Sequence, residues 1–173
     1  IYCAQCRGVP APPPAITASR SLSFSMSSEQ AARQDGDGPQ VALYVTCLAD
    51  LFRPSVGFAA LRLLQSAGCR VSVPESQTCC GQPAYNGGDY NAARPLARRV
   101  IEQLEGADYV VVPSGSCAGM ISHHYPRLLE GEWRERAIGV AAKTFELTTF
   151  LAEIAPPGVT HIAPRDLGTV TYH

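Results

Sequence analysis

The strongest constraint on the fold is an alternation of short apolar runs with helical segments that begins after residue 40. Residues 41–47 (VALYVTC) and 108–113 (DYVVVP) are apolar and rich in β-branched side chains, as strands are. Residues 54–66 and 90–105 instead place their apolar side chains at helical spacing. Strands separated by such helices predict parallel pairing, and uniformly apolar strands predict helices on both faces. We therefore expect a three-layer α/β domain with a mainly parallel sheet.

The same patterns predict the remaining elements of this domain. Short strands are expected at residues 69–73 and 169–173, and helices at residues 120–129, 133–142 and 145–154. Most of these segments are bounded by glycine or proline, which mark the turns between them.

Residues 1–40 differ in composition from the rest of the chain. They are rich in proline and serine and lack periodic apolar positions, which predicts a flexible tail ahead of a domain at residues 41–173. Met26 is a plausible native start. Cys3 and Cys6 have the spacing of half a metal knuckle, but no second pair follows nearby, so we expect them to be unstructured.

Composition excludes several classes of function. The net charge of −1 offers no basic surface for nucleic acid, and the longest apolar runs are too short to span a bilayer. No secretion signal is recognisable at the N-terminus, which predicts a cytoplasmic protein with reduced thiols. No phosphate-binding glycine motif and no paired carboxylates are found, so no catalytic residues are predicted. Seven cysteines then indicate metal, redox chemistry or burial.

Four cysteines follow the predicted strands directly. Cys47 ends the first strand, Cys79 and Cys80 lie in the loop after the second, and Cys117 lies in the loop after the third. Because the carboxyl ends of parallel strands share one edge of the sheet, these side chains are expected to converge there. Neighbouring side chains on an extended strand point to opposite faces, so the adjacent pair needs a bend, which Gly81 permits.

Convergent thiols under reducing conditions form a soft-ligand site for zinc or for an iron-sulfur cluster. Structural zinc sites usually take two ligands from one tight turn, whereas here three loops contribute and the only close pair is adjacent, which favours the cluster. Two alternatives stay open. One is a zinc-stabilised interaction module, and the other is a thiol-disulfide redox protein using Cys79 and Cys80, whose vicinal disulfide would close a strained ring.

Other reactive side chains near these cysteines have simpler explanations. Cys69 is expected to be a small buried hydrophobe in the core. His123 and His124 are expected to face solvent. Tyr85 and Asn86 border the cysteine-glycine turn, where they either close over a ligand or serve only as turn residues.

The order Cys47, Cys79-Cys80-Gly81 and Cys117 resembles the cysteine-rich CCG domain found in heterodisulfide reductase and in the iron-sulfur component of glycolate oxidase. The longer stretches VTCLADLFRPSVG, ESQTCCGQPAYNGGDYNAAR and VVPSGSCAGMISHHYPRLL resemble the lactate utilization A group. This resemblance implies an iron-sulfur cluster, expected to be of the 4Fe-4S type, at these four cysteines and Gly81. It also implies an electron-transfer component that works with other subunits to oxidise L-lactate, or a related 2-hydroxy acid.

The resemblance carries two further expectations. The fullest CCG pattern ends in C-x-x-C, but Met120 stands at its last position, so the four cysteines would be the complete ligand set. Members of the family usually carry two copies of the domain, and residues 169–173 (TVTYH) resemble the start of the first. Residues 41–173 are therefore expected to be the first of two copies.

Overall fold

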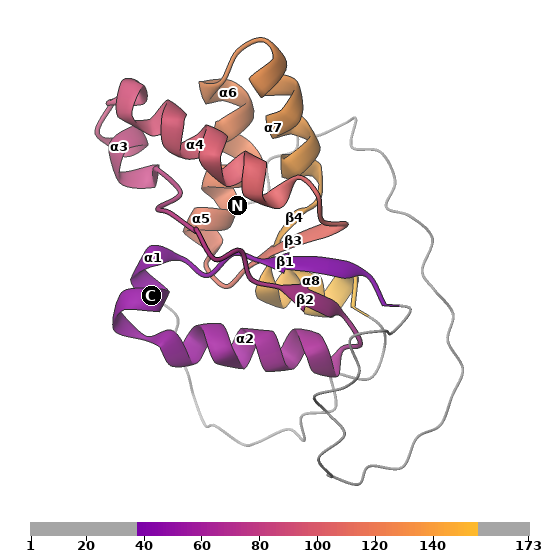
Figure 1. Ribbon diagram of the computed structural model, residues 1–173. Coiled ribbons are helices and arrows are strands. Elements are labelled where there is room, and N and C mark those ends of the chain that lie inside the picture. The colour runs from indigo at the N-terminus through magenta and orange to yellow at the C-terminus, as the bar shows by residue number, and fades with distance from the viewer. Residues whose placement is uncertain (1–37, 156–173) are drawn as a thin grey trace, which may run out of the picture.

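The computed structural model describes residues 38–155 (Figure 1). The predicted strand at residues 169–173, the pair Cys3 and Cys6, Met26 and nearly all of the predicted tail lie outside these residues. The expectations about them remain predictions. No helix within residues 38–155 is long and apolar enough to cross a membrane.

Four parallel strands form the centre of the domain. They are β1 (Gln40–Leu43), β2 (Arg70–Ser72), β3 (Tyr109–Val112) and β4 (Thr144–Glu146), in the spatial order β2-β1-β3-β4. Leu43 is in register with Val111, and Val111 with Phe145. Because the chain leaves β1 toward β2 and later returns to β3 on the other side of β1, the strand order reverses between β1 and β3. Open parallel sheets bind their ligands at such a switch point.

Helices cover both faces of the sheet, which confirms the predicted three-layer architecture (Figure 1). Val41, Leu43 and Val111 pack with residues of α2 (Pro54–Ser66) and α8 (Leu147–Glu153). Their neighbours along the strands point the other way and pack with α4 (Tyr90–Leu104) and α7 (Glu132–Ala142). Successive side chains of a strand alternate between faces, so an apolar strand buried on both sides needs two helical layers.

The N-terminal half follows the predictions closely, apart from the end of its first strand. Helix α2 has the predicted bounds, and Gly68 follows it with a φ of 81°. The strand predicted for residues 41–47 ends at Leu43, and Cys47 instead begins the short helix α1 (Cys47–Phe52). The reason is local, because the Thr46 side chain accepts a hydrogen bond from the Ala49 N–H at 3.4 Å and caps this helix.

The C-terminal half differs from the predictions at two element boundaries. The helix predicted for residues 120–129 begins earlier, as α5 (Gly115–Gly119), and continues through a π-helical turn, η2 (Met120–His124), into α6 (Tyr125–Leu128). The helix predicted for residues 145–154 begins only at Leu147, because the preceding residues form β4. The Glu146 carboxylate accepts hydrogen bonds from the Thr148 and Thr149 N–H groups and so caps α8 at this point.

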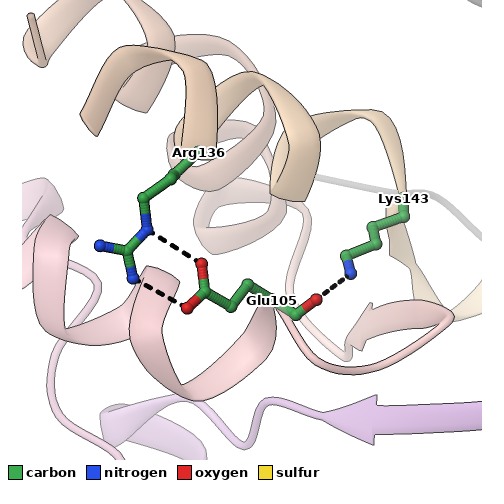
Figure 2. Close-up of polar contacts among 3 residues, drawn as sticks. All are labelled: Glu105, Arg136 and Lys143. Atoms are coloured by element: carbon green, nitrogen blue, oxygen red, sulfur yellow. Dashed lines mark hydrogen bonds and ion pairs between the residues drawn. The ribbon is translucent and has the colours of Figure 1, made fainter. Parts of the chain in front are cut away.

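Helices α4 and α7 are tied together on one side of the sheet. The Arg136 guanidinium of α7 donates to both carboxylate oxygens of Glu105, at 3.0 and 2.8 Å (Figure 2). Lys143 donates to the main-chain oxygens of Glu105 and Ala107, between α4 and β3. The Arg136 guanidinium also lies 4.1 Å from the centre of the Trp133 ring. These contacts hold the layer that covers the buried side of the cysteine site.

Candidate metal centre

The four cysteines singled out in the sequence lie where three strands end. Cys47 is the first residue of α1, which follows β1, and Cys117 is in α5, which follows β3. Cys79 and Cys80 lie in the loop between β2 and α3 (Gln82–Asn86). Because all four strands are parallel, these loops share the carboxyl edge of the sheet, beside the switch point between β1 and β3 (Figure 1).

The adjacent cysteines face different partners. The Cys80 thiol contacts Cys117, with the two sulfur atoms 3.5 Å apart. The Cys79 sulfur instead accepts a hydrogen bond from the Gly81 N–H at 3.4 Å, and Cys79 contributes to the raised pKa of the Cys47 thiol. The three loops thus place the four cysteines at one edge of the sheet, with Cys80 and Cys117 in direct contact.

Burial changes across the site. Cys80 and Cys117 are 3% and 9% exposed and belong to the apolar core beneath α4. Cys79 is half-buried, and Cys47 is exposed at the start of α1. The site is therefore closed by the core at one end and open to solvent at the other.

Gly81 provides the bend that separates the two cysteines. Its φ of 82° lies in the left-handed region, which residues with a side chain rarely adopt. Its backbone N–H points to the Cys79 sulfur, with nitrogen and sulfur 3.4 Å apart. An N–H donor of this kind offsets negative charge on a sulfur ligand.

Hydrogen bonds favour the thiolate form of one cysteine in particular. The Cys80 thiol, followed by the Ser114 and Ser116 hydroxyls, donates toward Cys117, and together they lower its pKa although burial opposes the shift. The pKa of Cys80 is raised, because it donates its proton to Cys117 and is itself buried. Partial burial and the nearby Cys79 and Cys117 raise the pKa of Cys47.

Two buried tyrosines contact the cysteine loop, and the sequence analysis did not identify them. The Tyr44 hydroxyl donates to the main-chain oxygen of Thr78, and the Tyr125 hydroxyl donates to that of Cys80 at 2.8 Å. Burial raises the pKa of Tyr44, and the four nearby thiols add to the shift. Tyr44 follows the first strand by one residue, but no sequence pattern indicates that Tyr125 reaches the same loop.

The structure agrees with the predictions for two of the remaining side chains and differs for the third. Cys69 is buried on the opposite face of the sheet, as predicted, and burial raises its pKa. His123 is exposed, as predicted. The prediction is wrong for His124, which is half-buried with its ring 4.6 Å from that of Tyr85. His124 is the last residue of the π-helical turn η2, and there its ring packs on the ring of Tyr85 from α3.

The donor set fits a metal centre held by sulfur. Four thiols with one N–H donor are soft ligands, suited to iron-sulfur clusters or zinc. Among residues 38–155, no three His, Cys, Asp or Glu side chains are grouped closely enough to hold a single metal ion. The assignment of these four cysteines and Gly81 as ligands and cofactor-binding residue remains a prediction.

Comparison with known proteins gives one family match and a set of similar proteins. Residues 41–122 match the CCG family, described as a cysteine-rich domain. These residues are therefore similar to the cysteine-rich CCG domain, which confirms the resemblance seen in the sequence. Among curated proteins, the chain is similar to several named lactate utilization protein A.

Two of these relatives give the extent of the similarity. The protein from an Exiguobacterium species is 48% identical over 139 residues, which cover 78% of this chain and 56% of the relative. The protein from Anoxybacillus flavithermus is 47% identical over 135 residues, with 77% and 56% covered. The chain thus spans just over half the length of the relatives it matches. No solved structure matches it significantly.

Proposed function

We propose that this chain is an iron-sulfur electron-transfer component of a complex that oxidises L-lactate or a related 2-hydroxy acid. The observation that carries the proposal is the position of four cysteines on three loops at the carboxyl edge of a parallel sheet, with the Cys80 and Cys117 sulfurs 3.5 Å apart. The name of its relatives, lactate utilization protein A, supports the pathway. The fold of the domain alone would not identify this pathway.

Each part of the site has a role in this proposal. Cys47, Cys79, Cys80 and Cys117 would bind the iron of one cluster, expected to be of the 4Fe-4S type, which when bound accepts and releases single electrons. The Gly81 N–H would offset charge on the Cys79 sulfur, and the core around Cys80 would exclude water from the inner side. No residue of the site is proposed to act on lactate itself.

Partner subunits are part of the proposal, because L-lactate oxidation to pyruvate releases two electrons that must pass onward. The side chains of Leu48, Leu51, Phe52 and Phe58, here called the α1–α2 face, are each at least 63% exposed. Large exposed apolar patches are typical of protein interfaces. This face begins directly after Cys47, the open end of the site, so we assign it to another subunit that exchanges electrons with the cluster.

The cytoplasm is the proposed location. All five cysteines of the described part are free thiols, which is typical of a reducing compartment. The two-copy organisation expected from the family resemblance stays a prediction.

Metal analysis after anaerobic reconstitution tests the proposed cofactor. The protein is expected to bind iron and sulfide, to absorb broadly in the visible range and to bleach on reduction with dithionite. A colourless protein that binds one equivalent of zinc would instead support the zinc-stabilised module. A protein that binds neither, with its thiols oxidised to a reversible disulfide, would support the thiol-disulfide alternative.

Growth on L-lactate tests the pathway separately from the cofactor. Deletion of the gene is expected to abolish growth on L-lactate but not on glucose, and the wild-type gene should restore it. A gene that encodes Cys80→Ser should fail to restore growth, whereas Cys69→Ser should succeed. Normal growth of the deletion strain on L-lactate would contradict the assignment to lactate oxidation while leaving the metal site intact.

A further inference from the structure

Two tyrosine hydroxyls hold the cysteine loop on either side of Cys79. Tyr44 lies just beyond β1, and its hydroxyl donates to the main-chain oxygen of Thr78. Tyr125 is the first residue of α6, and its hydroxyl donates to the main-chain oxygen of Cys80 at 2.8 Å. The two carbonyls therefore bracket the segment in which the adjacent cysteines turn toward different partners.

Both tyrosines are rigidly placed. Each is fully buried, and both rings belong to the core between the sheet and α4. A buried phenol normally has a hydrogen-bond partner, and here each partner is a carbonyl of the loop and not of a helix or strand. Within residues 38–155, the loop between β2 and α3 has no strand partner along Thr78–Cys80, so these bonds fix backbone that the sheet does not.

The direction of the two cysteines depends on this backbone. The Cys80 sulfur lies against that of Cys117, whereas the Cys79 sulfur accepts from the N–H of Gly81, where the chain bends. A rotation of either carbonyl would move the attached peptide plane and with it the neighbouring Cβ atom. Loss of a bond at Thr78 or Cys80 would therefore release the orientation of both thiols.

We propose that Tyr44 and Tyr125 are positioning residues, whose hydroxyls hold the Thr78 and Cys80 carbonyls and so keep Cys79 and Cys80 turned toward different partners before metal is bound. A preset ligand pair would bind metal without first ordering the loop. This consequence for the cluster rests on the proposed function. The positioning itself concerns the metal-free protein and is tested there.

The test is the rate at which each cysteine of the metal-free full chain is alkylated by N-ethylmaleimide, measured by peptide mass spectrometry. Removal of one net hydrogen bond is expected to raise the alkylation rate of Cys80 about fivefold in Tyr44→Phe and in Tyr125→Phe. Cys69, buried on the other face of the sheet, is the internal control and should not change. Tyr109→Phe removes a hydroxyl on the same face of the sheet as Cys69, and it should change the alkylation rate of neither Cys80 nor Cys69.

The outcomes separate positioning from general loosening. An unchanged Cys80 rate in both tyrosine variants would overturn the proposal, as would a parallel rise for Cys69, which would indicate lost stability of the whole domain. Iron binding is then measured on the same proteins. If the wild-type protein binds no iron, the proposed function fails, but the alkylation ratios still decide whether the two hydroxyls position the loop.

Discussion

At the residue scale, the site is defined by which sulfur contacts which. Adjacent cysteines on a regular strand would point to opposite faces and could not serve one centre. Here the left-handed conformation of Gly81 and the two tyrosine hydroxyls shape the loop so that Cys80 lies in the core against Cys117. Cys79 stays near the surface beside Cys47.

The contact between Cys80 and Cys117 predicts a specific oxidation product. When the metal-free protein is treated with diamide, their two sulfurs should form a disulfide with the loss of both thiol hydrogens, while diamide is reduced to the hydrazine. Peptide mass spectrometry should recover this link and not one between Cys79 and Cys80, whose ring is strained. A dominant link between Cys79 and Cys80, or none in which Cys80 takes part, would contradict the observed contact.

The hydrogen bonds to Cys117 predict its pH dependence. Only the thiolate reacts with an alkylating agent. The lowered pKa of Cys117 should therefore keep it reactive at a lower pH than an ordinary thiol. The raised pKa of Cys47 should have the opposite effect, so that Cys47 becomes reactive only at a higher pH. The pH profile of each alkylation rate measures this in the metal-free protein. Ser114→Ala with Ser116→Ala should move the Cys117 midpoint upward, and an unmoved midpoint would argue against the hydroxyl contribution.

At the element scale, the site depends on three loops that begin at the carboxyl ends of parallel strands. Helix α1 has no buried residue, so it contributes Cys47 and an exposed apolar face but little to the core. Helix α4 lies over the buried cysteines, and the contacts of Arg136 and Lys143 with Glu105 tie its end to α7 and to the residue before β4 (Figure 2). The rigid part of the site is therefore the side beneath α4.

Substitution of the glycine at the bend is predicted to weaken both fold and site. Gly81→Ala forces a side chain into the left-handed region and should lower the free energy of unfolding by about 1 kcal/mol. Gly139→Ala is the matched control, because Gly139 lies inside α7 with open space around it and should gain about 0.5–1 kcal/mol. Chemical denaturation measures both changes. Equal stability of the two variants would contradict the strain at Gly81.

The sequence predicted most of these elements because their apolar patterns are long enough to identify. Helix α2 and the three-layer arrangement were predicted from spacing alone. Strand β4 was missed because it has only three residues, and nothing in Thr144–Glu146 alternates for long enough to separate it from the helix that follows. The placement of the cysteines at one edge of the sheet was predictable from strand order, since it depends on topology and not on side-chain detail.

What the sequence could not give is the set of contacts made between distant elements. Tyr125 is 45 residues from Cys80 in the chain, and its hydrogen bond depends on how η2 and α6 pack against the sheet. His124 is half-buried for a similar reason, because it meets Tyr85 from another helix. Cys117 contacts Cys80 and not Cys79, and this choice likewise follows from the bend in the loop and not from the spacing of the cysteines.

At the scale of the whole molecule, the domain has a closed side and an open side. The cysteines run from the core beneath α4 to the surface at α1, where the α1–α2 face is exposed. An electron entering or leaving a cluster at this edge would travel the shortest distance through the open side. The proposed partner contact therefore lies beside Cys47.

Polar substitution of the α1–α2 face is predicted to separate folding from function. Leu51→Ser with Phe52→Ser should leave the unfolding transition and the bound iron unchanged, because both side chains are at least 70% exposed. The same changes in the gene should reduce growth on L-lactate by weakening contact with the partner protein. Ile138→Ser on α7, also exposed, is the control and should grow normally. Normal growth of the double variant would remove this face from the interface.

The most direct test of the central claim is iron and acid-labile sulfide content across a set of single Cys→Ser variants, each reconstituted anaerobically beside the wild-type protein. Cys80→Ser and Cys117→Ser should lose most of the bound iron and the visible absorption, and Cys47→Ser and Cys79→Ser should do the same. Cys69→Ser should retain both, since its thiol lies in the other core. Full iron content in Cys80→Ser or Cys117→Ser, or loss of iron in Cys69→Ser alone, would contradict a cluster held by the four thiols at the carboxyl edge of the sheet.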